Sequence, residues 1–143
     1  MFHKIIYLAV ISLVVMHASS AAALRCPVPA EYAKTIEIVI KDGKAKVISG
    51  YAITESPTEI VVRNEDTLTH GFNSSMFTDT MDVKMEGGSL AEGSGPHVYR
   101  VDAGKTLVLK FTLPPQEDSA TFTFWCDIHH AVTGEVLVVE FKC

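Results

Sequence analysis

Apolar and polar side chains alternate along most of this chain with the two-residue period of β-strands. The clearest case is KTLVLKFTL (105–113), where every second residue from Leu107 to Leu113 is apolar and Lys110 falls on the opposite face. Similar runs, separated by turns that contain Gly, Pro or Asp, occupy residues 35–40, 46–53, 58–64, 98–101, 120–126 and 134–141. No apolar run of helical period exceeds two turns. The pattern therefore predicts an all-β, antiparallel sandwich of about seven strands.

Two features interrupt this rhythm. Gly50 lies inside the run 46–53 and predicts a bulge or bend there. Residues 74–97 are rich in Gly, Ser, Asp and Met and predict a long excursion from the sandwich, with one helical turn around Met81–Met85. A loop of that length in a compact domain is usually functional or disordered.

The first residues have the pattern of an export signal. A basic start ending at Lys4 precedes a long apolar run, and small residues lead up to Ala23. We expect residues 1–23 to be a cleaved signal peptide and residues 24–143 to form one domain, located in the periplasm or secreted. Because residues 5–24 carry no acidic or basic side chain apart from His17, an uncut membrane anchor is the alternative. After cleavage we expect no stable membrane insertion.

Charge and motifs exclude several classes of function. The 143-residue chain has a net charge of −5, and loss of Lys4 with the signal makes the domain more acidic still. An acidic domain without a basic stripe is not expected to bind nucleic acid, but it suits a protein partner with a basic patch. The sequence contains no Gly-rich phosphate loop, nucleophile elbow or HExxH zinc motif.

The three cysteines of an exported protein suggest one disulfide and one free thiol. Cys26 and Cys143 lie at opposite ends of the mature chain, so the simplest pairing joins them and leaves Cys126 free. In an oxidising compartment a free thiol is at risk unless something occupies it. A bound metal ion would do so.

Cys126 is also part of a dense group of potential metal ligands. In the segment TFTFWCDIHH (121–130), His129 comes three residues after Cys126, and the bulky apolar Trp125 directly precedes Cys126. A third potential ligand, His70, follows an earlier predicted strand. One thiolate and two imidazoles suit copper, whereas a closed zinc site would use four donors.

These residues carry a resemblance to a known family. The motif N-x-D-x-x-x-H-x-F is formed by Asn64, Asp66, His70 and Phe72, and F-x-C-x-x-H begins at Phe124. Together they resemble the cupredoxins, the small blue copper proteins that include plastocyanin, amicyanin and pseudoazurin. The resemblance covers roughly residues 35–142 and implies an eight-stranded Greek-key sandwich. It also implies one type 1 copper ion held by His70, Cys126 and His129, with Asn64 joining the two ligand-bearing loops.

The chain departs from the family pattern at Val132, where the weak axial methionine usually falls. Either the copper has three ligands, or a weak donor comes from elsewhere. The candidates are the carbonyl of Thr69 and the side chains of Met76, Met81, Met85 and Glu86. His130 competes with His129, although its spacing from Cys126 is not that of the family, and His97 is expected to be a loop residue rather than a ligand.

The resemblance favours electron transfer to and from redox protein partners, without enzymatic activity. Copper delivery or storage is the alternative, because the Met-rich excursion offers ligands for Cu(I), and a metal-free binding module of the same fold is another. A multicopper oxidase would flank the cysteine with histidines, whereas Trp125 and Asp127 stand there. One short domain also lacks room for a second set of copper ligands.

Overall fold

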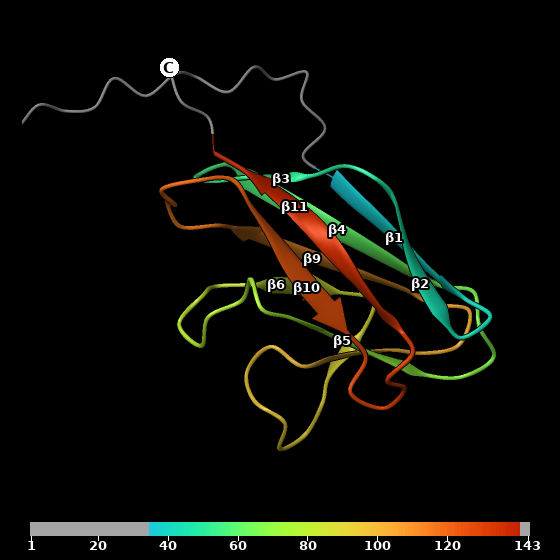
Figure 1. Cartoon of the computed structure of the whole chain (residues 1–143). Coiled ribbons are helices and arrows are strands. Elements are labelled where there is room, and N and C mark those ends of the chain that lie inside the picture. Colours follow the sequence, from blue (N-terminus) through green and yellow to red (C-terminus); the bar gives the residue numbers. More distant parts are fainter. Residues whose placement is uncertain (1–34, 141–143) are drawn as a thin grey trace, which may run out of the picture.

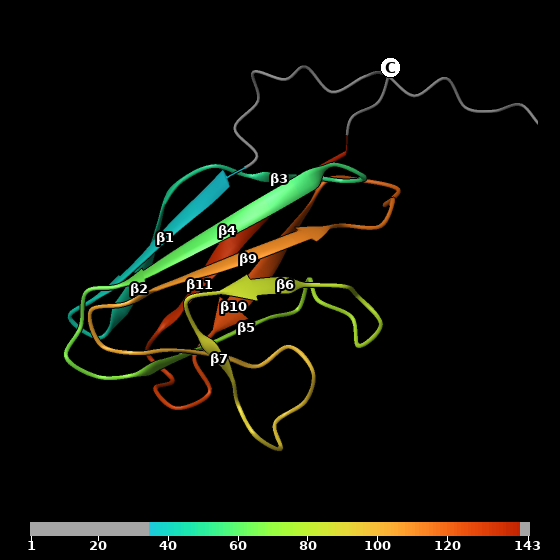
Figure 2. The same ribbon diagram turned by 180° about the vertical axis from the view of Figure 1, so that it is seen from behind.

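The computed structural model describes residues 35–140, which form two facing β-sheets without a helix among them (Figures 1 and 2). The first sheet has the order β2 (Lys44–Ser49), β1 (Thr35–Lys41), β4 (Pro57–Asn64), β9 (Thr106–Thr112) and β6 (Lys84–Glu86). The second has the order β3 (Ala52–Ile53), β11 (Thr133–Val139), β10 (Ala120–Trp125), β5 (His70–Ser74), β8 (Tyr99–Val101) and β7 (Ser89–Leu90). The predicted all-β sandwich is confirmed.

The sheets are mixed rather than purely antiparallel. β1 pairs with β4 in parallel, and β3 pairs with β11 in parallel, while the other pairs are antiparallel. The bend predicted at Gly50 explains how the chain leaves one sheet for the other. Gly50 has a φ of +88° and separates β2 from β3, and a Cβ there would collide with the backbone of Thr35.

The inward-facing side chains of the long strands fill the space between the sheets. Every second residue of β1 is buried, as are alternate residues of β4 and β9, and the facing sheet contributes large side chains from β5, β10 and β11. The largest buried apolar side chains are Tyr99, Phe72, Phe124, Ile36, Ile38, Ile40, Ile53, Ile60, Leu107, Leu109 and Leu113. Each such side chain contributes about 1.5–3 kcal/mol through removal of apolar surface from water.

The excursion of residues 74–97 is partly β-structure. The helical turn predicted around Met81–Met85 is wrong, because Lys84–Glu86 forms the edge strand β6 against β9. Met85 packs partly onto the core while Lys84 and Glu86 on either side are exposed, which is the alternation of a strand. The two-residue strand β7 then pairs with β8.

The two ends of the sandwich differ. The start of β1 and the end of β11 lie at one end, whereas the loop between β10 and β11 and the start of β5 lie at the other (Figure 1). This places the first and last described residues at the same end, as expected for a disulfide between the chain termini. Cys26 and Cys143 themselves lie outside the described residues, as does the expected signal peptide 1–23, so both remain predictions.

Candidate metal centre

His70 opens β5 and is almost completely buried. Its Nε2 lies 2.8 Å from Oδ2 of Asp66. Since a carboxylate at this distance accepts a hydrogen bond, the Nε2 atom carries the proton and Nδ1 is left with its lone pair. Nδ1 lies 3.9 Å from Sγ of Cys126. The nitrogen able to ligate a metal therefore lies beside the thiol.

Asp66 is itself held by the turn between β1 and β2. The backbone N–H groups of Asp42 and Gly43 donate to its two carboxylate oxygens over 2.7 and 3.1 Å. Burial alone would raise the pKa of Asp66, but the hydrogen bonds from Gly43, His70 and Asp42 together lower it below its usual value. Asp66 is therefore an anionic, fixed acceptor for the imidazole of His70.

Asn64 organises the loop that leads to His70. Its side-chain amide donates to the carbonyls of Leu68 (2.7 Å) and Val101 (3.0 Å), and its Oδ1 accepts the N–H of Asp66 (3.0 Å). These bonds join the His70 loop to β8. Among the interactions described for Asn64 none reaches the Cys126 loop, so the role expected from the family resemblance is only partly reproduced.

Cys126 follows β10 directly and has no exposed surface, and it carries a free thiol. Its Sγ accepts hydrogen bonds from the N–H groups of Gly71 (3.0 Å) and His129 (3.3 Å). The loop closes on itself, because Cys126 N–H donates to the carbonyl of Val132 and Val132 N–H donates to that of His129. Two backbone N–H donors are therefore directed at one buried sulfur atom.

His129 completes the group from the same loop. Its Nδ1 lies 3.8 Å from Sγ of Cys126, and its half-buried ring meets the ring of His70 edge-on at a centroid distance of 4.8 Å. The ligand atoms of His70, Cys126 and His129 all lie within 4.8 Å of one another. Three residues that were proposed as ligands from the sequence are therefore neighbours in space.

The other histidines are placed differently. His130 is exposed and is not part of the cluster. His97 lies before β8, where its Nδ1 is 2.9 Å from the hydroxyl of Tyr99 and its ring packs near Phe77. The structure thus groups His129, rather than its neighbour, with Cys126.

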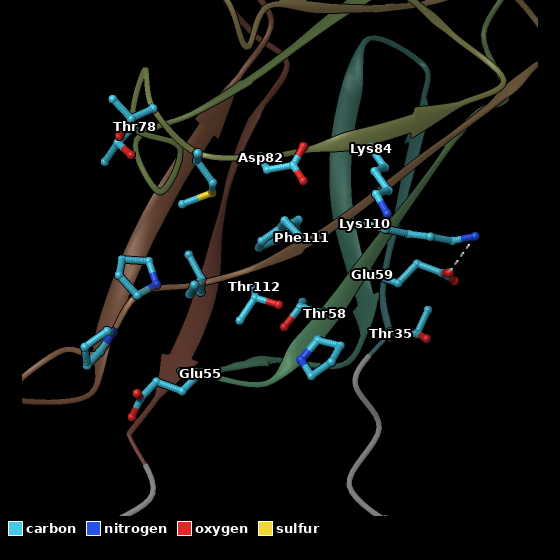
Figure 3. Close-up of a pocket in the computed structure, with 16 residues that line it drawn as sticks. Thr35, Glu55, Thr58, Glu59, Thr78, Asp82, Lys84, Lys110, Phe111 and Thr112 are labelled. Carbon is cyan, nitrogen blue, oxygen red and sulfur yellow. Dashed lines mark ion pairs between the residues drawn. The ribbon is translucent and has the colours of Figure 1, made fainter.

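Potential axial donors are scattered. Val132 is 2% exposed and belongs to the apolar core. His70 is the first residue of β5, whereas Met76 is buried two residues after the last residue of that strand. Met85 lies on β6 in the other sheet. Met81 lines a groove of about 930 Å³ between β4, β9 and the segment that precedes β6 (Figure 3). None of the three clustered ligands lines that groove.

The donor set fits a copper ion. One buried thiol and two imidazole nitrogens provide the two-nitrogen, one-sulfur arrangement of trigonal copper sites, and Cys126 and His70 are almost completely shielded from solvent. The cluster found among residues 35–140 contains three residues rather than the four of a closed zinc site.

Sequence reasoning assigned no role to two groups that contact this cluster. The carboxylate of Asp66 was part of the quoted motif, and its spacing of four residues from His70 was the available signal. The N–H of Gly71 was not recognised, since a backbone donor to a sulfur that lies 55 residues away leaves no trace in the local sequence.

Comparisons with known proteins report on the fold. No protein-family model and no curated protein sequence matches this chain. The multicopper oxidase McoA from the hyperthermophile Aquifex aeolicus matches over 80% of this chain with a TM-score of 0.55 and 12% identity. This chain spans only 31% of that oxidase.

Proteins of a length closer to that of this chain match as well. Dithionite-reduced auracyanin from the photosynthetic bacterium Roseiflexus castenholzii matches over 76% of this chain and 98% of its own, with a TM-score of 0.52 and 16% identity. An amicyanin variant matches with a TM-score of 0.40, which is too low to support an argument. At these identities the likeness shows the fold alone. The predicted cupredoxin-like sandwich is confirmed, and the cluster of two histidines and one cysteine fits a site of that fold.

Proposed function

We propose that this protein is an exported electron-transfer protein that carries one electron on a single type 1 copper ion. The observation that carries the proposal is the cluster of His70, Cys126 and His129, with ligand atoms within 4.8 Å of one another around a fully buried thiol. The ion would supply the Cu(I)/Cu(II) couple. The chain would supply its ligands and the surroundings that set its potential.

The residues around the cluster suit an electron carrier whose site geometry changes little when the ion changes its oxidation state. Asp66 fixes the tautomer and the ring orientation of His70, and the N–H groups of Gly71 and His129 fix the sulfur. Gly71 belongs to β5, His129 to the closed Cys126 loop, and Asp66 to a loop that the β1–β2 turn holds in place. Rigid ligands of this kind lower the rearrangement that accompanies electron transfer, because neither oxidation state has to rebuild the site.

The surface beside His129 suits a redox partner. His129 is the most exposed of the three ligands. Its sequence neighbour Ile128 is 46% exposed, and Leu68, in the loop that leads to His70, is 57% exposed. Exposed apolar residues around a buried centre favour short-lived docking of a protein partner. We propose that electrons enter or leave through His129 when a redox protein covers this patch.

Copper delivery is the second candidate, but the methionines argue against it. A delivery site uses exposed, exchangeable ligands, whereas Met76 is buried and Met81 and Met85 pack against the core. The oxidase function of McoA is also not transferred to this chain. Trp125 and Asp127 flank Cys126 where such enzymes have histidines, and the match covers 31% of the oxidase.

Export is proposed from the first residues of the sequence together with the fold. The part of the chain that the structure describes contains no helix long and apolar enough to cross a membrane.

Titration of the purified domain with Cu(II) tests the proposal. We expect saturation at one ion per chain and an intense visible thiolate-to-copper band. Cys126→Ser should lose the band and remain folded, while His130→Gln, the matched control next to His129, should keep it. A band that survives in Cys126→Ser would show that the assigned thiolate is wrong.

A further inference from the structure

An ion pair crosses β5 at Gly71, the residue after the candidate ligand His70. Arg100 of β8 donates from Nη1 and Nη2 to the two carboxylate oxygens of Asp127 over 2.8 and 2.7 Å. The side chains are 20% and 33% exposed, so both are partly shielded from water. A two-point guanidinium–carboxylate pair fixes orientation as well as distance.

The strand beneath the ion pair has a glycine at the crossing point. A Cβ at Gly71 would collide with the carboxylate of Asp127 and would lie 2.7 Å from Nη1 of Arg100. Gly71 pairs with Arg100 in the sheet, so the guanidinium reaches Asp127 by passing over this residue. The missing side chain is what lets the ion pair lie against the backbone.

The backbone at the same glycine contacts the thiol. Gly71 N–H donates to Sγ of Cys126 over 3.0 Å, and Cys126 is bonded directly to Asp127. Asn73 adds a weaker bond from Nδ2 to Asp127 over 3.4 Å. The loop that carries Cys126 is therefore attached to β5 through the sulfur and through the weaker Asn73–Asp127 bond, and to the neighbouring β8 through Arg100.

We propose that Arg100 and Asp127 are positioning residues that hold the Cys126 loop against β5 and so keep the Gly71 N–H directed at the sulfur. As a statement about copper this rests on the proposed function, but the placement of the thiol does not require the metal. Hydrogen bonds to the cysteine sulfur are one of the factors that set the potential of such sites. A lost N–H bond leaves more negative charge on sulfur, which favours Cu(II).

The electrostatics agree with this geometry. The guanidinium of Arg100 holds the pKa of Asp127 below its usual value, against the opposing effect of burial. Asp127 is therefore an anion at neutral pH, and the ion pair is present under the conditions of the experiment below.

The first test measures the reactivity of Cys126 in metal-free protein with an aromatic disulfide reagent, and peptide mass spectrometry identifies the modified cysteine. Arg100→Gln and Asp127→Asn each break the pair, and we expect each to speed labelling of Cys126 about tenfold, because the loop opens more often. The double variant should be no faster than either single variant. Arg63→Gln is the matched control, since it removes an ion pair of 3.5 Å between Arg63 of β4 and Glu37 of β1. It should label at the wild-type rate.

Arg100→Lys keeps the charge but not the two-point geometry, and we expect an intermediate rate. Unfolding midpoints are recorded for every variant. If they show that Arg100→Gln does not fold, Arg100→Lys takes its place in the test. Labelling at the wild-type rate in folded Arg100→Gln and Asp127→Asn would overturn the proposal. Equal acceleration in Arg63→Gln would overturn it as well, since the effect would then be general.

A second readout uses the copper-loaded proteins. Arg100→Gln should have a lower reduction potential than wild type, whereas Arg63→Gln should leave it unchanged. If the wild type takes up no copper, the proposed function fails, yet the labelling rates still decide whether the ion pair positions the thiol. An unchanged potential in a variant that labels faster would limit the role of the pair to metal-free protein and overturn its part in setting the potential.

Discussion

Replacement of Asp66 by asparagine tests how the chain prepares His70 for a metal. The carboxylate of Asp66 lies 2.8 Å from Nε2 of His70 and accepts two backbone N–H bonds from the turn between β1 and β2. Asparagine has nearly the same shape but no charge, and its NH₂ group cannot accept. The substitution therefore weakens the acceptor for the imidazole while leaving the size of the residue unchanged.

The expected magnitude follows from the contact that is lost. Outer partners of ligating histidines typically change metal affinity by about 10- to 100-fold, or about 1.4–2.7 kcal/mol. The loss should be larger for Cu(II) than for Cu(I), because an anion behind the imidazole stabilises the more highly charged ion. The reduction potential should therefore rise. Loss of charge-assisted bonds from Asp42 and Gly43 should also destabilise the fold, by about 1–2 kcal/mol.

Three measurements separate these effects: competition with a Cu(II) chelator, voltammetry and denaturant unfolding of metal-free protein. Asp102→Asn is the matched control. The Oδ1 atom of Asp102 accepts a hydrogen bond of 3.0 Å from the hydroxyl of Thr69, which lies in the same loop as Asp66. No contact between Asp102 and His70 is described. If Asp66→Asn changed Cu(II) affinity and potential no more than Asp102→Asn does, the carboxylate would have no specific role at His70.

Three further predictions concern the axial position, the termini and a buried phenol. Val132→Met should lower the potential relative to wild type, because a thioether favours Cu(II); an unchanged or raised value in voltammetry would mean that residue 132 does not face the metal. Cys26 and Cys143 should form a disulfide, and peptide mapping that finds both as free thiols in exported protein would contradict this. Burial raises the pKa of Tyr99 to about 12 from 10.0, so the stability linked to its neutral form is complete below pH 10 and is lost as the pH rises to 12. In Tyr99→Phe this part of the alkaline loss should be absent from denaturant unfolding curves, and an identical decline in both proteins would show that Tyr99 is not its source.

The fold was largely predictable because the long strands bury one face. β1, β4 and β9 alternate between buried and exposed residues, and this is what a two-residue apolar period reports. β5 escaped prediction for the opposite reason. All five of its residues are buried although most are polar, so HGFNS has no alternation. The parallel pairs of β1 with β4 and of β3 with β11 depend on tertiary packing, which no local pattern encodes.

The candidate ligands were predictable because two of them share one short loop. Cys126 and His129 are three residues apart, and the motif around His70 supplied the third. The ion pair that crosses β5 at Gly71 was not predictable. Arg100 and Asp127 are separated by 27 residues and are charged, so in the sequence each resembles an ordinary surface residue. Only the pairing of β5 with β8, and the absence of a side chain at Gly71, bring them together.

The surroundings of the cluster should act on the potential in opposite directions. At the proposed copper site an apolar Val132 would withhold an axial donor and favour Cu(I), whereas the Asp66 carboxylate would strengthen His70 as a ligand and favour Cu(II). The two residues act through different ligand positions, so their effects should be roughly additive. The double variant with Asp66→Asn and Val132→Met should therefore have a potential between those of the two single variants, as measured by voltammetry on all four proteins. A double variant whose potential lies outside that interval would show that the two positions do not act independently, or that one of the two signs is wrong.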